Sequence, residues 1–181
     1  MQRVMDSPAV MKIRRATVDD AAALAEFGAR TFYETFAADN TAEDMAKHLA
    51  SAWSPHLQGA EIADPLLDTL LAVDADGAFG GFAQLHAERA PADVPMQKPV
   101  ELKRFYVDKS WQGRGLARDL MAAVEHQARA RGARELWLGV FQRNARARAF
   151  YSKCGFRKVG TQVFVVGDDP QSDDIMLKEL T

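Results

Sequence analysis

Apolar and polar residues alternate with the period of a strand or a helix along most of the chain. The segment "MKIRRA" (11–16) has the short apolar and basic pattern of a first strand. After it, Thr17 and Asp20 form a capping-box pattern in front of a stretch with helical periodicity. Thr41 and Asp44 repeat that pattern before a second such stretch. We therefore expect two helices to follow the first strand.

The middle of the chain is rich in strand patterns. The segment "DTLLAVDADGAFGGFAQLHAER" (68–89) contains two apolar runs separated by Asp76 and Gly77, a tight-turn pair that predicts a β-hairpin. The segments "PVELKRFYV" (99–107) and "RELWLGVF" (134–141) predict two more strands. Because the second of these is apolar on both faces, we expect it to lie inside the sheet.

A helix is predicted between these two strands. Leu116, Leu120, Val124 and Ala128 recur at helical spacing, and Gly132 is suited to end the helix. A connection of this length joins parallel strands more readily than antiparallel ones. We therefore expect the strands at either end of this helix to run parallel.

The last predicted helix begins after Asn144, a favoured N-cap residue, and ends before Gly155. Its apolar stripe consists of Ala147, Phe150, Tyr151 and Cys154. Two final strands follow, in the segments 156–167 and 173–180. The pattern as a whole predicts an α/β (α+β) fold with a mixed, mainly antiparallel sheet flanked by helices, in a single domain over residues 11–181. Residues 1–10 have no periodic pattern, and we expect them to be a disordered N-terminal extension.

Composition fits this interpretation. A chain of 181 residues that is 48% hydrophobic and 27% charged has the size and apolar content of one domain with its own core. Cys154 alone makes no internal disulfide, and four scattered histidines lack the spacing of metal ligands. No apolar run approaches the ~20 residues of a membrane helix, and the first residues lack a signal-peptide pattern. We therefore expect a cytoplasmic protein with neither metal nor membrane contact.

A basic segment surrounds a loop that is rich in glycine. The net charge is −2, yet residues 101–160 alone carry +9. Within them, "SWQGRGLARDL" (110–120) lies between a predicted strand and a predicted helix. At the N-terminus of a helix, free backbone N–H groups and the helix dipole attract anions. Gly113 and Gly115 have no side chains and would let a phosphate approach the backbone closely. For an isolated loop, a plain tight turn is the preferred explanation of the two glycines.

Two common phosphate loops do not fit this segment. A Walker loop ends in Gly-Lys-Ser/Thr, but Gly115 is followed by Leu116 and Ala117. A dinucleotide-binding fingerprint would require its third glycine at the position of Arg118. A nucleic-acid-binding module is also disfavoured, because no recognition helix or aromatic stacking motif accompanies the basic segment.

The remaining pattern is Q-x-x-G-x-A, formed by Gln112, Gly115 and Ala117, and it resembles motif A of the GCN5-related N-acetyltransferase (GNAT) superfamily. The segment "ELWLGVFQRNARARAFYSKCGF" (135–156) resembles the next strand and helix of that family. The resemblance implies acetyl-CoA as co-substrate, no metal, and a sheet splayed between its fourth and fifth strands. It also implies that one loop holds the pyrophosphate of acetyl-CoA. This loop consists of Gln112, Gly113, Arg114, Gly115, Leu116 and Ala117.

The same resemblance assigns roles in acetyl transfer. A bulged strand would hold the pantetheine arm through the backbone of Phe105, Tyr106 and Val107, with one N–H facing the thioester oxygen. Asn144 would contact the pantetheine, and Tyr151 would protonate the departing thiolate. On the residues alone, the preferred interpretation of Tyr151 is a core aromatic beside Phe150.

An amine acceptor also requires a route for its proton. Glu101 is the candidate base, acting through a water, and Glu34 is a second candidate. A solvated surface carboxylate is the other interpretation of each. Transfer in the family is direct, so Cys154 is expected to fill the core rather than to act as a nucleophile.

Two further blocks, 29–49 and 165–177, resemble the PaiA-type spermidine/spermine N-acetyltransferases within this family. This likeness implies a small-molecule amine as acceptor, such as a polyamine, for which acidic residues including Glu34 would provide attraction. The positive charge of Lys103 would oppose this attraction. A protein or peptide amine as acceptor, a non-catalytic acyl-CoA sensor and a homodimer remain open alternatives.

Overall fold

The computed structural model describes residues 11–181, so the predicted extension 1–10 lies outside the described residues. The helices and strands, in chain order, are β1 (Lys12–Arg15), α1 (Ala21–Phe36), α2 (Ala42–Ala52), α3 (Pro55–Ala63), β2 (Leu67–Val73), β3 (Phe79–Ala87), β4 (Pro99–Val107), α4 (Leu116–Ala130), β5 (Glu135–Phe141), α5 (Ala145–Lys153), β6 (Arg157–Val166) and β7 (Asp169–Glu179). Single turns of 3-10 helix lie at Val18–Asp20, Ala37–Asp39 and Lys109–Trp111.

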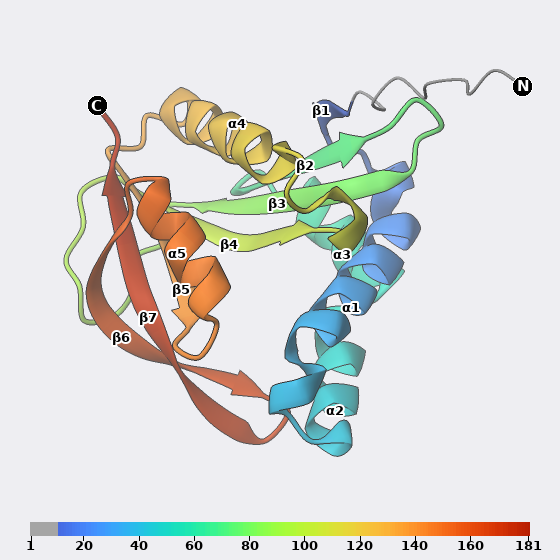
Figure 1. Ribbon diagram of the computed structural model, residues 1–181. Helices are drawn as coiled ribbons and strands as arrows, with labels where there is room; N and C mark the ends of the chain where they lie inside the picture. Colours follow the sequence, from blue (N-terminus) through green and yellow to red (C-terminus); the bar gives the residue numbers. More distant parts are fainter. Residues whose placement is uncertain (1–10) are drawn as a thin grey trace, which may run out of the picture.

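The strands form one sheet of seven, in the order β1-β2-β3-β4-β5-β7-β6. Every neighbouring pair is antiparallel except β4 and β5, which are parallel and joined by α4. Helices α4 and α5 cover one face of the sheet, and α1 to α3 cover the other (Figure 1). The predicted fold class and the predicted parallel pair are therefore confirmed.

Local polar contacts begin the helices where the sequence patterns indicated. Thr17 and Asp20 form the capping box ahead of α1, and the Thr41 hydroxyl accepts a hydrogen bond from the N–H of Asp44 at 3.1 Å. Such contacts satisfy N–H groups that have no partner inside the helix. The β2–β3 hairpin turns at Gly77, whose φ of 86° favours glycine.

The prediction of two helices after β1 was wrong, because α3 is a third. The Ser54 hydroxyl accepts from the N–H of Leu57 at 3.1 Å, and Pro55 occupies the first turn, so both residues mark a helix start. Gln58 is the one fully buried residue of α3. The helix therefore lacks the apolar stripe on which helix prediction relies.

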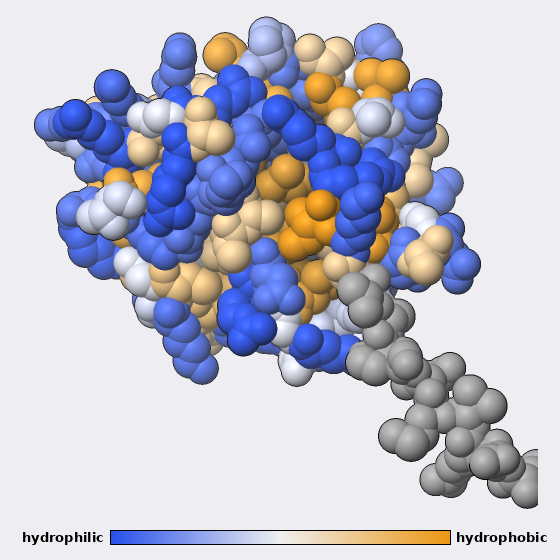
Figure 2. All heavy atoms as spheres, turned by 90° about the horizontal axis from the view of Figure 1, so that it is seen from above, coloured by the Kyte–Doolittle hydropathy of each residue, from blue (hydrophilic) through white to orange (hydrophobic). Residues whose placement is uncertain are grey.

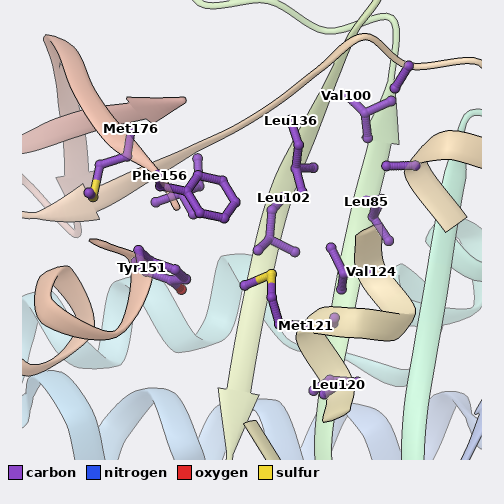
Figure 3. Packing of buried hydrophobic residues seen from close by; sticks show 14 of the residues in the cluster. Leu85, Val100, Leu102, Leu120, Met121, Val124, Leu136, Tyr151, Phe156 and Met176 are labelled. Atoms are coloured by element: carbon purple, nitrogen blue, oxygen red, sulfur yellow. The ribbon is translucent and has the colours of Figure 1, made fainter. Parts of the chain in front are cut away.

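Two apolar clusters hold the layers together. On one face, Leu120 and Val124 of α4 pack against Leu85, Leu102 and Leu136 of the sheet (Figure 3). The second cluster fills the space between α1, α2 and the other face and consists of Leu24, Phe27, Phe32, Met45, Trp53, Leu71, Val73, Phe82 and Val166. Hydrophilic residues cover much of the surface seen from above, with apolar residues gathered near its middle (Figure 2).

Two helix glycines should respond in opposite ways to alanine. A Cβ on Gly28 would overlap the Trp53 ring, whereas a Cβ on Gly59 would meet only Ala21, at 3.7 Å. We expect Gly28→Ala to lower the free energy of unfolding by about 1–3 kcal/mol through overpacking. Gly59→Ala should raise it by about 0.5–1 kcal/mol through helix propensity. Urea unfolding measures both, and stabilisation by Gly28→Ala would contradict the α1–Trp53 packing.

Candidate functional site

The parallel strands β4 and β5 separate part of the way along their length. They pair only over Pro99–Glu101, opposite Glu135–Trp137. Beyond that point β4 continues beside β3, and β5 continues beside β7. The backbone of Phe105–Val107 therefore has no partner strand on its β5 side, and the predicted splay between the fourth and fifth strands is confirmed.

A β-bulge precedes the open part of β4. Gln84 pairs with Arg104 and Leu85 pairs with Leu102, so Lys103 is an extra residue. Neighbouring side chains of a regular strand point to opposite faces. The bulge instead directs Lys103 and Arg104 to the same face, where both pair with Glu61 of α3.

A cavity of about 660 Å³, called the central pocket below, is associated with this gap. The sequence-predicted residues that line it are Glu34, Glu101, Phe105, Tyr106, Val107, Gln112, Gly113, Gly115, Ala117, Asn144 and Tyr151. Two others do not line it: Leu116 is buried in the core, and the Arg114 guanidinium lies over the Trp111 ring at 5.7 Å. Segments far apart in the chain thus meet around one space.

The glycine loop, Gln112–Ala117, forms one wall of the central pocket. Gly113 and Gly115 have φ values of 77° and 89°, a backbone conformation that favours glycine. Nothing lies within 4 Å of the position that a Cβ of Gly113 would take, and only Arg118 lies near that of Gly115, at 3.7 Å. Since α4 begins at Leu116, the first N–H groups of this helix lack helical partners and add the positive end of its dipole.

Basic side chains surround this loop. Lys109, Arg118 and Arg146 all line the central pocket. The Gln112 side chain joins two walls, because its amide N–H donates to the Val107 carbonyl at 3.1 Å and its oxygen accepts from Arg146. Backbone donors and full positive charges therefore meet in a geometry suited to a phosphate group.

Tyr151 projects from α5 toward β4 (Figure 3). Its ring packs edge-on against Phe105, with 6.3 Å between centroids, and against Phe156 at 5.9 Å. Burial first, and then the nearby Tyr106 phenol, raise the pKa of Tyr151 above its ordinary value. The phenol therefore stays protonated at neutral pH, which suits a proton donor.

The two candidate bases lie in different surroundings. Glu101 is the last residue of β4 that pairs with β5, and its side chain is 14% exposed. Burial raises its pKa, although Arg89 lies 3.3 Å away and opposes that shift. Glu34 on α1 lies 3.3 Å from Arg30 and 3.8 Å from Lys109.

Asn144 uses its side-chain carbonyl oxygen to cap α5, where it accepts a hydrogen bond from the Ala147 N–H at 3.1 Å.

Sequence reasoning missed two acidic residues at this site. Glu61 pairs with Lys103 at 2.6 Å and so offsets a positive charge beside the central pocket. It lies on α3, the helix that was not predicted. Asp173 of β7 is buried and lines the central pocket. The adjacent acids Asp173 and Asp174, directly before the apolar run 175–177 of β7, were the available indication, since a buried carboxylate usually has a specific partner.

Two observations bear on other classes of site. Within residues 11–181, no group of three or more His, Cys, Asp or Glu side chains is arranged to hold a metal ion. No helix in this part of the chain has the length and apolar character needed to cross a membrane.

Comparison with known proteins identifies relatives over nearly the whole chain. Residues 25–156 match the family model described as Acetyltransferase (GNAT) family. An uncharacterized N-acetyltransferase in the pepI 3′ region of Lactobacillus delbrueckii subsp. lactis is 34% identical over 170 residues, which cover 94% of this chain and 98% of the relative. The aminoglycoside N(6')-acetyltransferase type 1 of Stenotrophomonas maltophilia is 33% identical over 153 residues, covering 84% of this chain and 90% of that protein.

The fold also matches solved structures. The crystal structure of PaiA N-acetyltransferase from Thermoplasma acidophilum, in complex with coenzyme A, superposes with a TM-score of 0.77 at 23% identity. The match covers 94% of this chain and 99% of that chain. At this level of identity the likeness concerns the fold.

Proposed function

The chain belongs to the GNAT acetyltransferase family and is an acetyl-CoA-dependent N-acetyltransferase, and from this premise we propose that its acceptor is a positively charged small-molecule amine. A polyamine such as spermidine is the first candidate. The observation that carries the proposal is the central pocket, which has basic side chains beside the glycine loop and carboxylates elsewhere in its lining, at the gap between β4 and β5.

The residues of this chain fit acetyl-CoA. The open space at Gly113 and Gly115 leaves room for the pyrophosphate against the backbone of Gln112–Ala117. The backbone of Phe105–Val107 has no partner strand on its β5 side. The pantetheine arm can therefore hydrogen-bond to it in the way that a neighbouring strand would. Asn144 retains its amide N–H groups for the same arm while its oxygen caps α5. Bound there, acetyl-CoA supplies the thioester whose acetyl group is transferred.

Residues around the gap then assist the transfer. One N–H of Phe105–Val107 donates to the thioester oxygen and stabilises the charge that develops on it. The Tyr151 phenol donates its proton to the sulfur atom as the carbon–sulfur bond breaks. Glu101 receives the proton of the acceptor nitrogen through a water, and its raised pKa favours that step. Glu34, already flanked by Arg30 and Lys109, is better suited to attract the acceptor at the entrance.

The ion pairs that Lys103 and Arg104 form with Glu61 favour a cationic acceptor. Lys103 would repel an ammonium group if it were free, but Glu61 lies 2.6 Å from its nitrogen, and Arg104 pairs with the same carboxylate. An aminoglycoside is the second candidate, because a relative of that name matches 84% of this chain. Both candidates carry several ammonium groups and would use the same features.

A screen of acceptors tests this proposal. We expect thiol release from acetyl-CoA to be fastest with spermidine or spermine, then with kanamycin, and slower with neutral amino acids or a lysine peptide. The measurement is kcat/KM for each acceptor, with acetyl-CoA hydrolysis in the absence of an acceptor as the background. A preference for the peptide, or no rate above background with any amine, would refute the proposed acceptor class.

The glycine loop is tested by Gly115→Val. A branched side chain at a φ of 89° strains the turn and occupies the space in front of the helix N-terminus. We expect acetyl-CoA to bind at least ~10-fold more weakly, by calorimetric titration of the folded variant. Gly132→Val is the matched control, since Gly132 has a φ of 74° at the opposite end of α4. Equal affinity in the two variants would remove the loop from the binding site.

The role of Tyr151 is tested by Tyr151→Phe. Phenylalanine keeps the ring contacts with Phe105 and Phe156 but removes the proton, so acetyl-CoA affinity should remain while kcat falls by about 10²–10⁴. Tyr106→Phe is the control, because Tyr106 is a second tyrosine, half-buried, that lines the central pocket. If Tyr106→Phe shows the larger loss, or Tyr151→Phe shows none where chemistry limits the rate, the assignment fails.

A further inference from the structure

Asp173 on β7 is a buried carboxylate that faces the central pocket. Only 7% of the residue is exposed. Within residues 11–181 its oxygens have no hydrogen-bond or ion-pair partner, and they are not sealed from solvent but open into the central pocket. Burying a carboxylate without a partner is unfavourable, so such a group usually serves a ligand.

The adjacent Asp174 shows what a structural carboxylate looks like in the same strand. It lies on the opposite face of β7, where Gln142 donates to it at 2.9 Å. Lys158 lies 2.6 Å away and Arg148 3.0 Å away. Asp174 is therefore fully compensated, whereas Asp173 is not.

Gly139 of β5 makes room for the Asp173 carboxylate at the wall of the central pocket. A Cβ on Gly139 would lie 3.2 Å from the Asp173 Oδ2 atom and would overlap the Gln162 amide of β6. Glycine at position 139 therefore lets the Asp173 carboxylate and the Gln162 amide both lie against β5. Phe141 and Phe164 line the same pocket, and aromatic rings are favourable neighbours for an organic cation.

The other carboxylates that line the central pocket already have basic partners. Glu34 lies 3.3 Å from Arg30, and Glu101 lies 3.3 Å from Arg89. Beside the pocket, Glu61 pairs with both Lys103 and Arg104 and offsets one of their two charges. Asp173 is thus the uncompensated acid that an acceptor would meet inside the pocket.

We propose that Asp173 binds the ammonium group of the acceptor and thereby selects cationic amines. This inference rests on the proposed function, since it names the group that recognises the acceptor class. Asp173 binds and positions the substrate, while proton removal remains with Glu101.

The acceptor affinity should consequently depend on pH. Burial, and then the negative charge of Asp174, raise the pKa of Asp173 to about 6. Around it, β4 contributes the Tyr106 phenol, while β5 and β6 contribute the uncharged Gly139 and Gln162. The carboxylate is charged above that pH and neutral below it. The KM of the acceptor should therefore rise as the pH falls through about 6.

The test compares Asp173→Asn with the wild-type protein and with Asp76→Asn, a matched loss of charge in the exposed β2–β3 turn. With the best acceptor of the screen, Asp173→Asn should raise the acceptor KM by about 30-fold or more and leave the acetyl-CoA KM unchanged. Its acceptor KM should also lose the inflection near pH 6. Asp76→Asn should behave as the wild type.

Unfolding provides a second readout. Asp173→Asn removes a buried charge that has no partner, so its thermal stability at pH 7 should equal or exceed that of the wild type. A structural role for the carboxylate predicts a clear loss of stability instead. An unchanged acceptor KM, or lower stability with both KM values altered, overturns the inference.

Failure of the proposed function is distinguishable from failure of this inference. If no amine in the screen is acetylated, equilibrium dialysis of radiolabelled spermidine against the coenzyme A complex replaces the kinetic measurement. Binding to the wild type that is lost in Asp173→Asn supports the Asp173 site even though transfer was not found. Absence of binding to the wild type, or equal binding to both proteins, overturns it.

Discussion

The extra residue at Lys103 is the local irregularity on which the site depends. Because of this bulge, Leu102 and Phe105 both face the α4 and α5 layer, while Lys103 and Arg104 both face α3. Glu61 holds the two cations together, so the bulge is fixed by an ion cluster as well as by the sheet. A bulge bends its strand and increases the local twist, and β4 leaves β5 within a few residues of this position.

The separation of these strands concentrates unused hydrogen-bonding capacity in one place. Between the other neighbouring strands of the sheet, backbone groups are paired, as the stability of a folded protein requires. In the gap, the backbone of Phe105–Val107 lacks a β5 partner, and Asp173 lacks a cation. The chain tolerates these unmet groups because two apolar clusters stabilise the sheet from both faces. Such local cost is characteristic of functional sites.

The positive charge of residues 101–160 is distributed by the fold for several purposes. Arg131 pairs with the buried Asp68, which lies at the start of β2. Arg148 and Lys158 compensate Asp174. These pairs are structural, and they leave Lys109, Arg118 and Arg146 among the side chains that line the central pocket near the glycine loop. The basic segment is thus partly a stabilising network and partly a proposed anion site.

The sequence by itself determined most of the elements and the position of the glycine loop. Capping at Thr17, Thr41 and Asn144 and the turn at Gly77 depend on residues within a few positions of one another, and periodicity records which face of an element is buried. Only the tertiary structure decided that α3 forms beside the sheet, that Glu61 meets Lys103 across 42 positions, and that Asp173 remains without a cation while Asp174 has two. These features depend on which distant side chains meet, and contacts between distant positions leave no periodic pattern in the chain.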